Sequence, residues 1–214
     1  MYKKKFFFIV FEGIEGSGKS YLSRRLFKNL KKKNLNPILT REPGGTKSAE
    51  IIREVILKDY FGKASKVQFD KYTDTLLYLA ARNEHIRNKI KPAFKQKKII
   101  ICDRFIDSTT AYQVYGKGVN KNLIDNIHKH ILNGIKPNIT FLLKVNISRA
   151  LKRLNKRKKK NRYDKFSKAF YINAQKSFIK IAKKNKRKYY IFDNSLDNNN
   201  IEKKITNIVL SKLK

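Results

Sequence analysis

Cysteine, acidic residues and long apolar runs are all scarce in this sequence. The single cysteine, Cys102, excludes an internal disulfide and a Cys-x-x-Cys metal site. No apolar run approaches the roughly 18 residues of a membrane span. The run Phe6–Phe11 is short and meets Glu12 without a small-residue cleavage site, so we interpret it as a buried strand. Because no repeat and no Pro- or Ser-rich linker divides the chain, residues 1–214 are predicted to form one domain.

Basic residues dominate the charge, since 52 Lys and Arg oppose 16 Asp and Glu and give a formal charge of +36. The hydrophobic fraction of 41% is large enough for a folded core and excludes a wholly disordered basic tail. The lysine-rich part of Lys152–Lys165 lacks the interleaved aromatic residues of a base-stacking surface, and no zinc-finger, RRM or basic-zipper pattern occurs. A nucleic-acid-binding protein is kept as the non-enzymatic alternative, and nonspecific adhesion to nucleic acid is expected from the charge alone.

Short apolar runs alternate with helical patterns along the chain. The predicted strands are Phe6–Phe11, Pro37–Thr40, Ile99–Cys102, Ile139–Leu143 and Tyr189–Phe192. The predicted helices are Tyr21–Lys32, Ser48–Lys58, Tyr72–Ile90, Lys121–Asn133, Arg149–Arg157, Phe166–Lys184 and Ile201–Leu213. Strands that alternate with helices predict an α/β fold with a parallel sheet.

A glycine-rich motif of the form G-x-x-x-x-G-K-S lies between the first strand and the first helix. It consists of Gly13, Ile14, Glu15, Gly16, Ser17, Gly18, Lys19 and Ser20. Such a loop curls its backbone N–H groups around phosphate oxygens at a helix N-terminus, while the lysine reaches the β- and γ-phosphates and the serine hydroxyl can bind Mg²⁺. The motif predicts an ATP site, and a chance glycine-rich turn is the minor alternative.

The third predicted strand ends at Asp103 and Arg104. This is the carboxyl edge of the sheet, where open α/β folds bind their ligands. Asp103 is a candidate to hold Mg²⁺ or one of its waters, and Arg104 is a candidate to bind a second anionic group such as an acceptor phosphate. The alternative is an ion pair between the two residues that caps the strand.

Several further segments, together with the glycine-rich loop, resemble the thymidylate kinases. They are Thr40–Thr46 (TREPGGT), Tyr78–Arg82, Asp103–Gln113, Pro137–Thr140 and Asn161–Asp164. The resemblance extends from about Phe6 to about Tyr190. It implies a P-loop kinase fold of three layers, with a five-stranded parallel sheet flanked by helices and a short basic lid at about residues 150–164. It also implies a cytoplasmic homodimer that uses ATP and Mg²⁺ to phosphorylate dTMP to dTDP.

The resemblance assigns roles to individual residues. Lys19, Ser20 and Asp103 match the ATP and Mg²⁺ side, and Arg41 and Arg104 match positions near the acceptor phosphate. The residues that match the nucleoside part of the acceptor site are Glu15 near the 3′-hydroxyl, Tyr78 against the thymine ring, Arg82 and Thr109 at the thymine edge, Tyr112 near the sugar 2′ carbon, and their neighbours Ser108 and Gln113. Because Tyr78 and Arg82 are four residues apart, a helix would present them on one face.

The sequence departs from the family pattern at a few positions. Gly16 stands where some relatives carry a catalytic arginine, so the missing charge is expected from Arg153, Arg157 or Arg162, in that order of preference. Lys117 replaces a frequent arginine, and Asn161 and Asp164 replace the usual acids of the lid motif. His85, His128 and His130 have no acid–base task in phosphoryl transfer and are expected to be surface or helix residues.

The nearest enzymatic alternative is another P-loop kinase, such as a deoxynucleoside kinase. Arg41 and Arg104 argue against it, because two arginines buried at the acceptor end without an anion would be costly.

Overall fold

The structure is a computed structural model that describes residues 6–58, 60, 68–157, 161–196 and 200–214, with the backbone alone at residues 164 and 165. Lys158, Lys159 and Lys160 of the predicted lid and the side chain of Asp164 lie outside the described residues.

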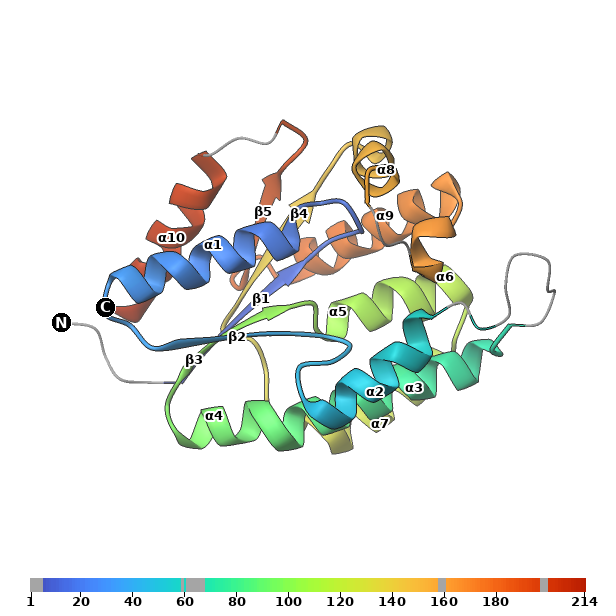
Figure 1. The fold of residues 1–214 in the computed structure, drawn as a ribbon, viewed down its shortest axis with the longest axis horizontal. Helices are drawn as coiled ribbons and strands as arrows, with labels where there is room; N and C mark the ends of the chain where they lie inside the picture. The colour runs from blue at the N-terminus through green and yellow to red at the C-terminus, as the bar shows by residue number, and fades with distance from the viewer. Residues whose placement is uncertain (1–5, 59, 61–67, 158–160, 197–199) are drawn as a thin grey trace.

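Five parallel strands form one sheet in the order β2-β3-β1-β4-β5 (Figure 1). Their bounds are β1 (Phe7–Glu12), β2 (Pro37–Arg41), β3 (Ile99–Asp103), β4 (Ile139–Lys144) and β5 (Tyr189–Asp193). All five predicted strands are confirmed. In the register of β2 and β3, Arg41 lies beside Asp103, so the polar ends of both strands meet at the same carboxyl edge.

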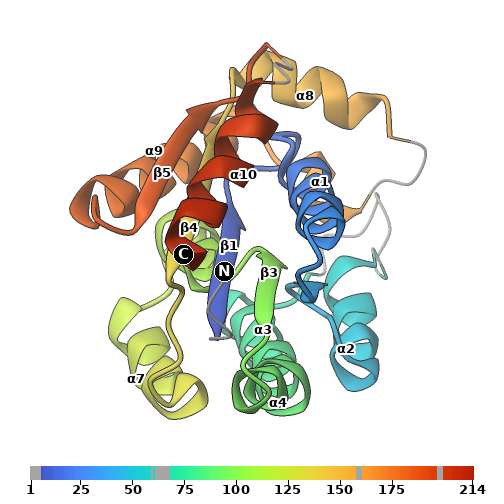
Figure 2. The ribbon, with the colours of Figure 1, turned by 90° about the vertical axis from the view of Figure 1, so that its left-hand side faces the viewer.

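Helices cover both faces of the sheet, because the side chains of a strand alternate between its faces. Phe7, Ile9 and Phe11 of β1 pack in one apolar cluster with α1 (Lys19–Lys32) and α10 (Asn200–Leu213). Phe8 and Val10 point to the other face, where they pack with Ile86 and Ile90. Figure 2 shows α1 and α10 on one side of the strands and α4 and α7 on the other. The predicted α/β fold with a parallel sheet flanked by helices is confirmed.

Most of the remaining helices lie between successive strands. They are α2 (Lys47–Leu57), α3 (Lys71–His85), the π-helix η1 (Ile86–Ile90), α4 (Lys91–Lys95), α7 (Lys121–Leu132), α8 (Ile147–Asn155), the 3₁₀ turn η3 (Arg162–Lys165) and α9 (Lys168–Lys184). In the part of the chain that is described, no helix combines the length and the apolar character needed to cross a membrane.

One helical stretch was not predicted from the sequence. After β3 the chain forms α5 (Ile106–Thr109), the π-helix η2 (Thr110–Val114) and α6 (Tyr115–Lys117). Its buried residues include Asp107, Thr109 and Gln113 as well as Ala111 and Tyr112, so no apolar stripe with helical spacing marks it.

Candidate active site

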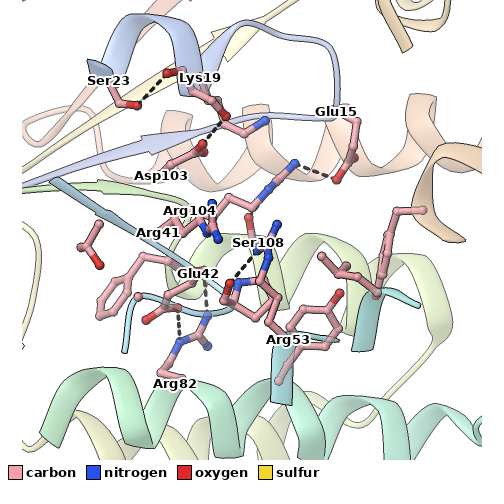
Figure 3. A pocket seen from close by; sticks show the side chains of 18 of the residues that line it. Glu15, Lys19, Ser23, Arg41, Glu42, Arg53, Arg82, Asp103, Arg104 and Ser108 are labelled. Atoms are coloured by element: carbon pink, nitrogen blue, oxygen red, sulfur yellow. Dashed lines mark hydrogen bonds and ion pairs between the residues drawn. The ribbon is translucent and has the colours of Figure 1, made fainter. Parts of the chain in front are cut away.

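A cavity of about 510 Å³ opens at the carboxyl edge of the sheet (Figure 3). The phosphate loop (residues 13–20), the ends of β2 and β3, and helices α2 and α3 contribute to its wall. The predicted site residues that line it are Glu15, Lys19, Ser20, Arg41, Tyr78, Arg82, Asp103, Arg104, Ser108, Thr109, Tyr112, Gln113 and Arg157. Residues predicted for the ATP side and residues predicted for the acceptor side therefore share one cavity.

The phosphate loop leads into the N-terminus of α1. Gly18 caps this helix at φ 92°, a left-handed conformation that favours glycine, and the Asn194 amide occupies the space that a Cβ would need. The Nδ2 atom of Asn194 donates to the carbonyl oxygen of Ser17 at 2.9 Å. Because the helix N-terminus carries partial positive charge and unpaired N–H groups, the loop presents a site for an anion.

Lys19 is folded into the phosphate loop. Its Nζ donates to the carbonyl oxygen of Ile14 at 2.6 Å and to Ser17 Oγ at 3.3 Å. Burial, with a contribution from the nearby Arg104, lowers the pKa of Lys19 to about 7. An anionic phosphate would favour the charged ammonium, so this lysine is prepared to bind one.

Ser20 and Asp103 meet at the junction of α1 and β3. Ser20 Oγ donates to Asp103 Oδ2, while Asp103 Oδ1 is buried and has no hydrogen-bond partner among the described residues. No group of three or more His, Cys, Asp or Glu side chains gathers at one point in the described part of the chain. One hydroxyl and one carboxylate with an open oxygen suit Mg²⁺, which keeps several waters and binds substrate phosphates through its other positions.

Arg104 joins the phosphate loop to the helical stretch after β3. Its Nη2 donates to Glu15 Oε1 at 2.7 Å, and its Nη1 donates to the Gly13 carbonyl oxygen at 2.9 Å and to Ser108 Oγ at 3.0 Å. The hydroxyl of Tyr112 donates to the other Glu15 oxygen at 2.5 Å. Burial opposes the ionisation of Glu15, but the charges of Arg104 and Lys19 outweigh it and hold the pKa of Glu15 below its usual value.

A second cationic group lies on the β2 side of the cavity. The Nη2 of Arg41 donates to Glu50 Oε2 at 2.9 Å, and the Arg41 side chain is 50% exposed. Arg53 of α2 also lines the cavity and donates to the Pro43 carbonyl oxygen at 2.6 Å. Sequence reasoning missed Arg53, because an arginine inside an amphipathic helix carries no signal of its own.

These contacts correct the argument against a deoxynucleoside kinase. Arg41 is half exposed and paired with Glu50, and Arg104 is paired with Glu15. Neither arginine is therefore buried without an anion, and the expected burial cost does not arise.

Arg82 is buried in a polar network behind the cavity. Its Nε donates to Glu42 Oε2 at 2.7 Å, its Nη1 to Thr109 Oγ1 at 2.8 Å, and its Nη2 to the Phe105 carbonyl oxygen at 2.9 Å. These bonds hold the Arg82 guanidinium in one orientation. Among the described residues, Nη2 has no second acceptor, which leaves one of its N–H groups for a ligand.

Two histidines belong to this network, His85 of α3 and His128 of α7, and both are helix residues as expected, with buried side chains. His128 Nε2 lies 2.6 Å from Arg82 Nη1, and burial together with the charge of Arg82 lowers the pKa of His128 to about 3. The ring is therefore neutral and accepts from the guanidinium. His85 is fully buried between Thr40 Oγ1 at 2.7 Å and Glu42 Oε1 at 2.9 Å.

Three tyrosine rings form an aromatic wall. Tyr163 packs edge-on against Tyr78 at a centroid distance of 6.0 Å and against Tyr112 at 5.9 Å. Gln113 Nε2 donates to the Tyr163 hydroxyl at 3.3 Å. Tyr163 was not predicted as a site residue, since only the fold brings it back to α3.

The three candidate lid arginines occupy different places. Arg153 donates to the carbonyl oxygens of Gly16 and Asn194, both at 2.9 Å, and so supports the phosphate loop from behind. Arg157 lines the cavity, and Arg162 forms an ion pair with Asp74. Of these three arginines, Arg157 alone is among the residues that line the cavity.

Comparisons with known proteins point to one family. The family model described as thymidylate kinase matches residues 11–205. A thymidylate kinase of Wolbachia pipientis subsp. Culex pipiens is 42% identical over 212 residues, which are 97% of each chain. A thymidylate kinase of Aster yellows witches'-broom phytoplasma is 39% identical over 97% of this chain and 96% of its own length. The crystal structure of a thymidylate kinase from Ehrlichia chaffeensis matches with a TM-score of 0.74 and 34% identity, over 96% of this chain and 99% of that one.

Proposed function

The chain belongs to the thymidylate kinase family, and we propose that it transfers the γ-phosphoryl group of ATP to the 5′-phosphate of dTMP, giving dTDP and ADP. One observation carries the proposal: the cavity joins a phosphate loop to a wall that holds an oriented arginine and an aromatic ring. A phosphate donor and a flat base with a hydrogen-bonding edge can occupy it together.

On the donor side, the phosphate loop and Lys19 bind the β- and γ-phosphates of ATP, which is the substrate that this family uses. Ser20 and Asp103 are the residues that hold Mg²⁺, which when bound neutralises phosphate charge and orients the transferring group. Lys19 then exchanges its contact with the Ile14 carbonyl for a phosphate oxygen.

On the acceptor side, Arg41, Arg53 and Arg104 neutralise the 5′-phosphate of dTMP. Because both reacting phosphates are anionic, these cations reduce the repulsion that opposes an in-line attack. Tyr78 stacks on thymine, and the remaining N–H of Arg82 together with Thr109 reads the edge of the base. Glu15 accepts from the 3′-hydroxyl, and Tyr112, which it already binds, crowds the 2′ position.

The lid segment, about residues 150–164, supplies the charge that Gly16 lacks. We assign this task to Arg157, because it lines the cavity and neither Arg153 nor Arg162 does. An arginine in this place would stabilise the equatorial oxygens in the transition state.

Several general expectations go with this function. Residues 1–214 act as one domain, and the enzyme works in the cytoplasm. It forms a homodimer, for which α2 and α3 offer the exposed apolar side chains of Ile51 (69% exposed) and Leu76 (51%). Light scattering in solution tests the dimer. The charge of +36 adds salt-sensitive, nonspecific adhesion to nucleic acid.

Coupled ADP release from the purified protein tests the reaction, with Mg²⁺-ATP and a panel of dTMP, dUMP, UMP, CMP and thymidine. Selective turnover of dTMP is the expected result. Turnover of thymidine but not dTMP would make the protein a nucleoside kinase. No turnover of any acceptor, combined with salt-sensitive DNA binding, would favour the nucleic-acid alternative.

A further inference from the structure

Asp74 is a fully buried carboxylate in the first turn of α3 that no step of the proposed reaction uses. Three groups from two distant segments converge on it. Lys117 Nζ of α6 donates to Asp74 Oδ2 at 2.6 Å, the Tyr163 hydroxyl lies 3.4 Å from the same oxygen, and the guanidinium of Arg162 forms an ion pair with Oδ1. A buried carboxylate is costly unless cations compensate it, so this cluster holds the segments together only while both signs of charge are present.

The position of Asp74 connects this cluster to the acceptor side of the cavity. Asp74, Tyr78 and Arg82 follow each other at intervals of four residues and so share one face of α3. Tyr163, whose hydroxyl lies near Asp74, packs its ring edge-on against Tyr78. A displacement of Tyr163 would therefore change the wall against which the base lies.

Lys117 is the second cation of the cluster and packs against the same segment. Its Nζ lies 5.7 Å from the centre of the Tyr163 ring and 6.0 Å from that of Phe166. Burial lowers the pKa of Lys117 to about 8. The charged and titratable groups around α6 are Asp74 and Lys71 of α3, Arg162 and Tyr163 of η3, and Lys180 of α9, which stands over Tyr115.

We propose that Asp74 is a positioning residue that docks η3, the C-terminal part of the lid segment, against α3 and thereby completes the acceptor pocket. Lys117 and Arg162 are its two docking cations, and Tyr163 is the group that docking places against Tyr78. Arg162 accordingly serves this contact and not the transferring phosphate. The inference rests on the proposed function, because the pocket it completes is the one assigned to dTMP.

Steady-state kinetics of Asp74→Asn provides the first test, with Asp125→Asn as the matched control. Asp125 is also paired with a lysine, Lys121, but on the exposed surface of α7. We expect Asp74→Asn to raise the KM for dTMP by about tenfold or more, because two partly buried cations lose their partner. The KM for ATP should stay within about twofold of wild type, and the control should leave both constants unchanged.

The pH dependence gives a readout that a merely structural role would not move. As the pH rises through about 8, Lys117 loses its charge and with it one docking contact. The KM for dTMP of the wild type should therefore rise between pH 7 and pH 9.5. Lys117→Arg should abolish that rise, because a guanidinium stays charged throughout this range.

A fluorescence measurement separates this inference from the proposed function. The chain has no tryptophan, so Phe166→Trp introduces a single reporter beside Lys117. Adding Asp74→Asn to this protein should shift its emission to longer wavelength as the segment undocks, whether or not dTMP is a substrate. If Asp74→Asn does not fold, Lys117→Gln takes its place in both assays. Unchanged emission together with an unchanged KM for dTMP would overturn the proposal. If Asp74→Asn shifts the emission but the wild type does not turn over dTMP, only the proposed function is overturned.

Discussion

Glu15 of the phosphate loop and Arg104 at the end of β3 form an ion pair across the cavity, with 2.7 Å between Oε1 and Nη2 (Figure 3). Glu15, which is assigned to the 3′-hydroxyl of dTMP, thus holds Arg104, which is assigned to the 5′-phosphate of the same molecule. The orientation of Arg104 is set before any substrate binds, which reduces the ordering that binding must impose.

We predict that Glu15→Gln lowers kcat/KM for dTMP about 10-fold to 100-fold, because a charge-assisted hydrogen bond contributes about 1.5–3 kcal/mol. Arg104 loses its anionic partner, and Tyr112 loses a carboxylate acceptor. Initial-rate kinetics measures the effect. Glu54→Gln, an exposed position on α2, is the control and should behave as wild type. Equal kcat/KM in both variants would remove Glu15 from the acceptor site.

Lys19→Met should reduce kcat by about 10²-fold to 10³-fold, the usual cost of removing one electrostatic contact to a transition state. Thermal stability should not fall, because among the described residues the buried ammonium donates hydrogen bonds to the loop alone, and a buried charge is costly. Turnover and melting temperature are compared with those of Lys28→Met, which removes an exposed lysine from α1. A lower melting temperature with normal turnover would indicate that Lys19 is only structural.

Glu42→Gln should destabilise the protein by about 3–5 kcal/mol, the range for breaking a buried ion pair on one side. The side chains of Glu42 and Arg82 are only 4% and 3% exposed, and Glu42 also binds His85. Denaturant unfolding measures the loss. Glu202→Gln is the matched control, because Glu202 pairs with Arg25, which is 45% exposed, and it should cost about 1 kcal/mol or less. Similar losses of unfolding free energy in both variants would contradict the buried network around Glu42.

Stability should depend on pH through Glu12. Burial, reinforced by the charge of Asp107, raises the pKa of Glu12 to about 8. The folded state therefore binds the Glu12 proton more tightly than the unfolded state does, and this proton adds to the free energy of unfolding at low pH. That contribution is lost as the pH rises from about 4.5 through about 8. Relative to wild type, Glu12→Gln should be more stable at pH 9 than at pH 5. Unfolding free energies of both proteins at the two pH values test this, and an equal difference at both would refute it.

Arg157→Ala should lower kcat more than it raises the KM for ATP, because its charge is assigned to the transition state. Arg153→Ala should mainly raise the KM for ATP, because Arg153 supports the loop at the Gly16 carbonyl oxygen. Single-turnover and steady-state rates of both variants distinguish the two roles. The reverse pattern would restore Arg153 as the first candidate.

The sequence predicted the strands and most helices because each carries its own apolar pattern. It also predicted that Asp103 and Arg104 lie at the carboxyl edge of the sheet, where β3 ends beside β1 and β2. It did not predict the partners of Arg104 and Arg82, nor the roles of Arg53 and Tyr163. Those depend on segments far apart in the chain, and the helical stretch after β3 that holds several of them buries polar groups without an apolar period.

If one cavity binds ATP and dTMP together, the phosphoryl group passes directly from ATP to dTMP. Phosphorus NMR of the protein with Mg²⁺-ATP and dTMP tests this transfer. We expect dTDP to replace dTMP in an amount equal to the ADP formed, and we expect Lys19→Met to suppress both products. Formation of ADP and free phosphate with dTMP unchanged would contradict it.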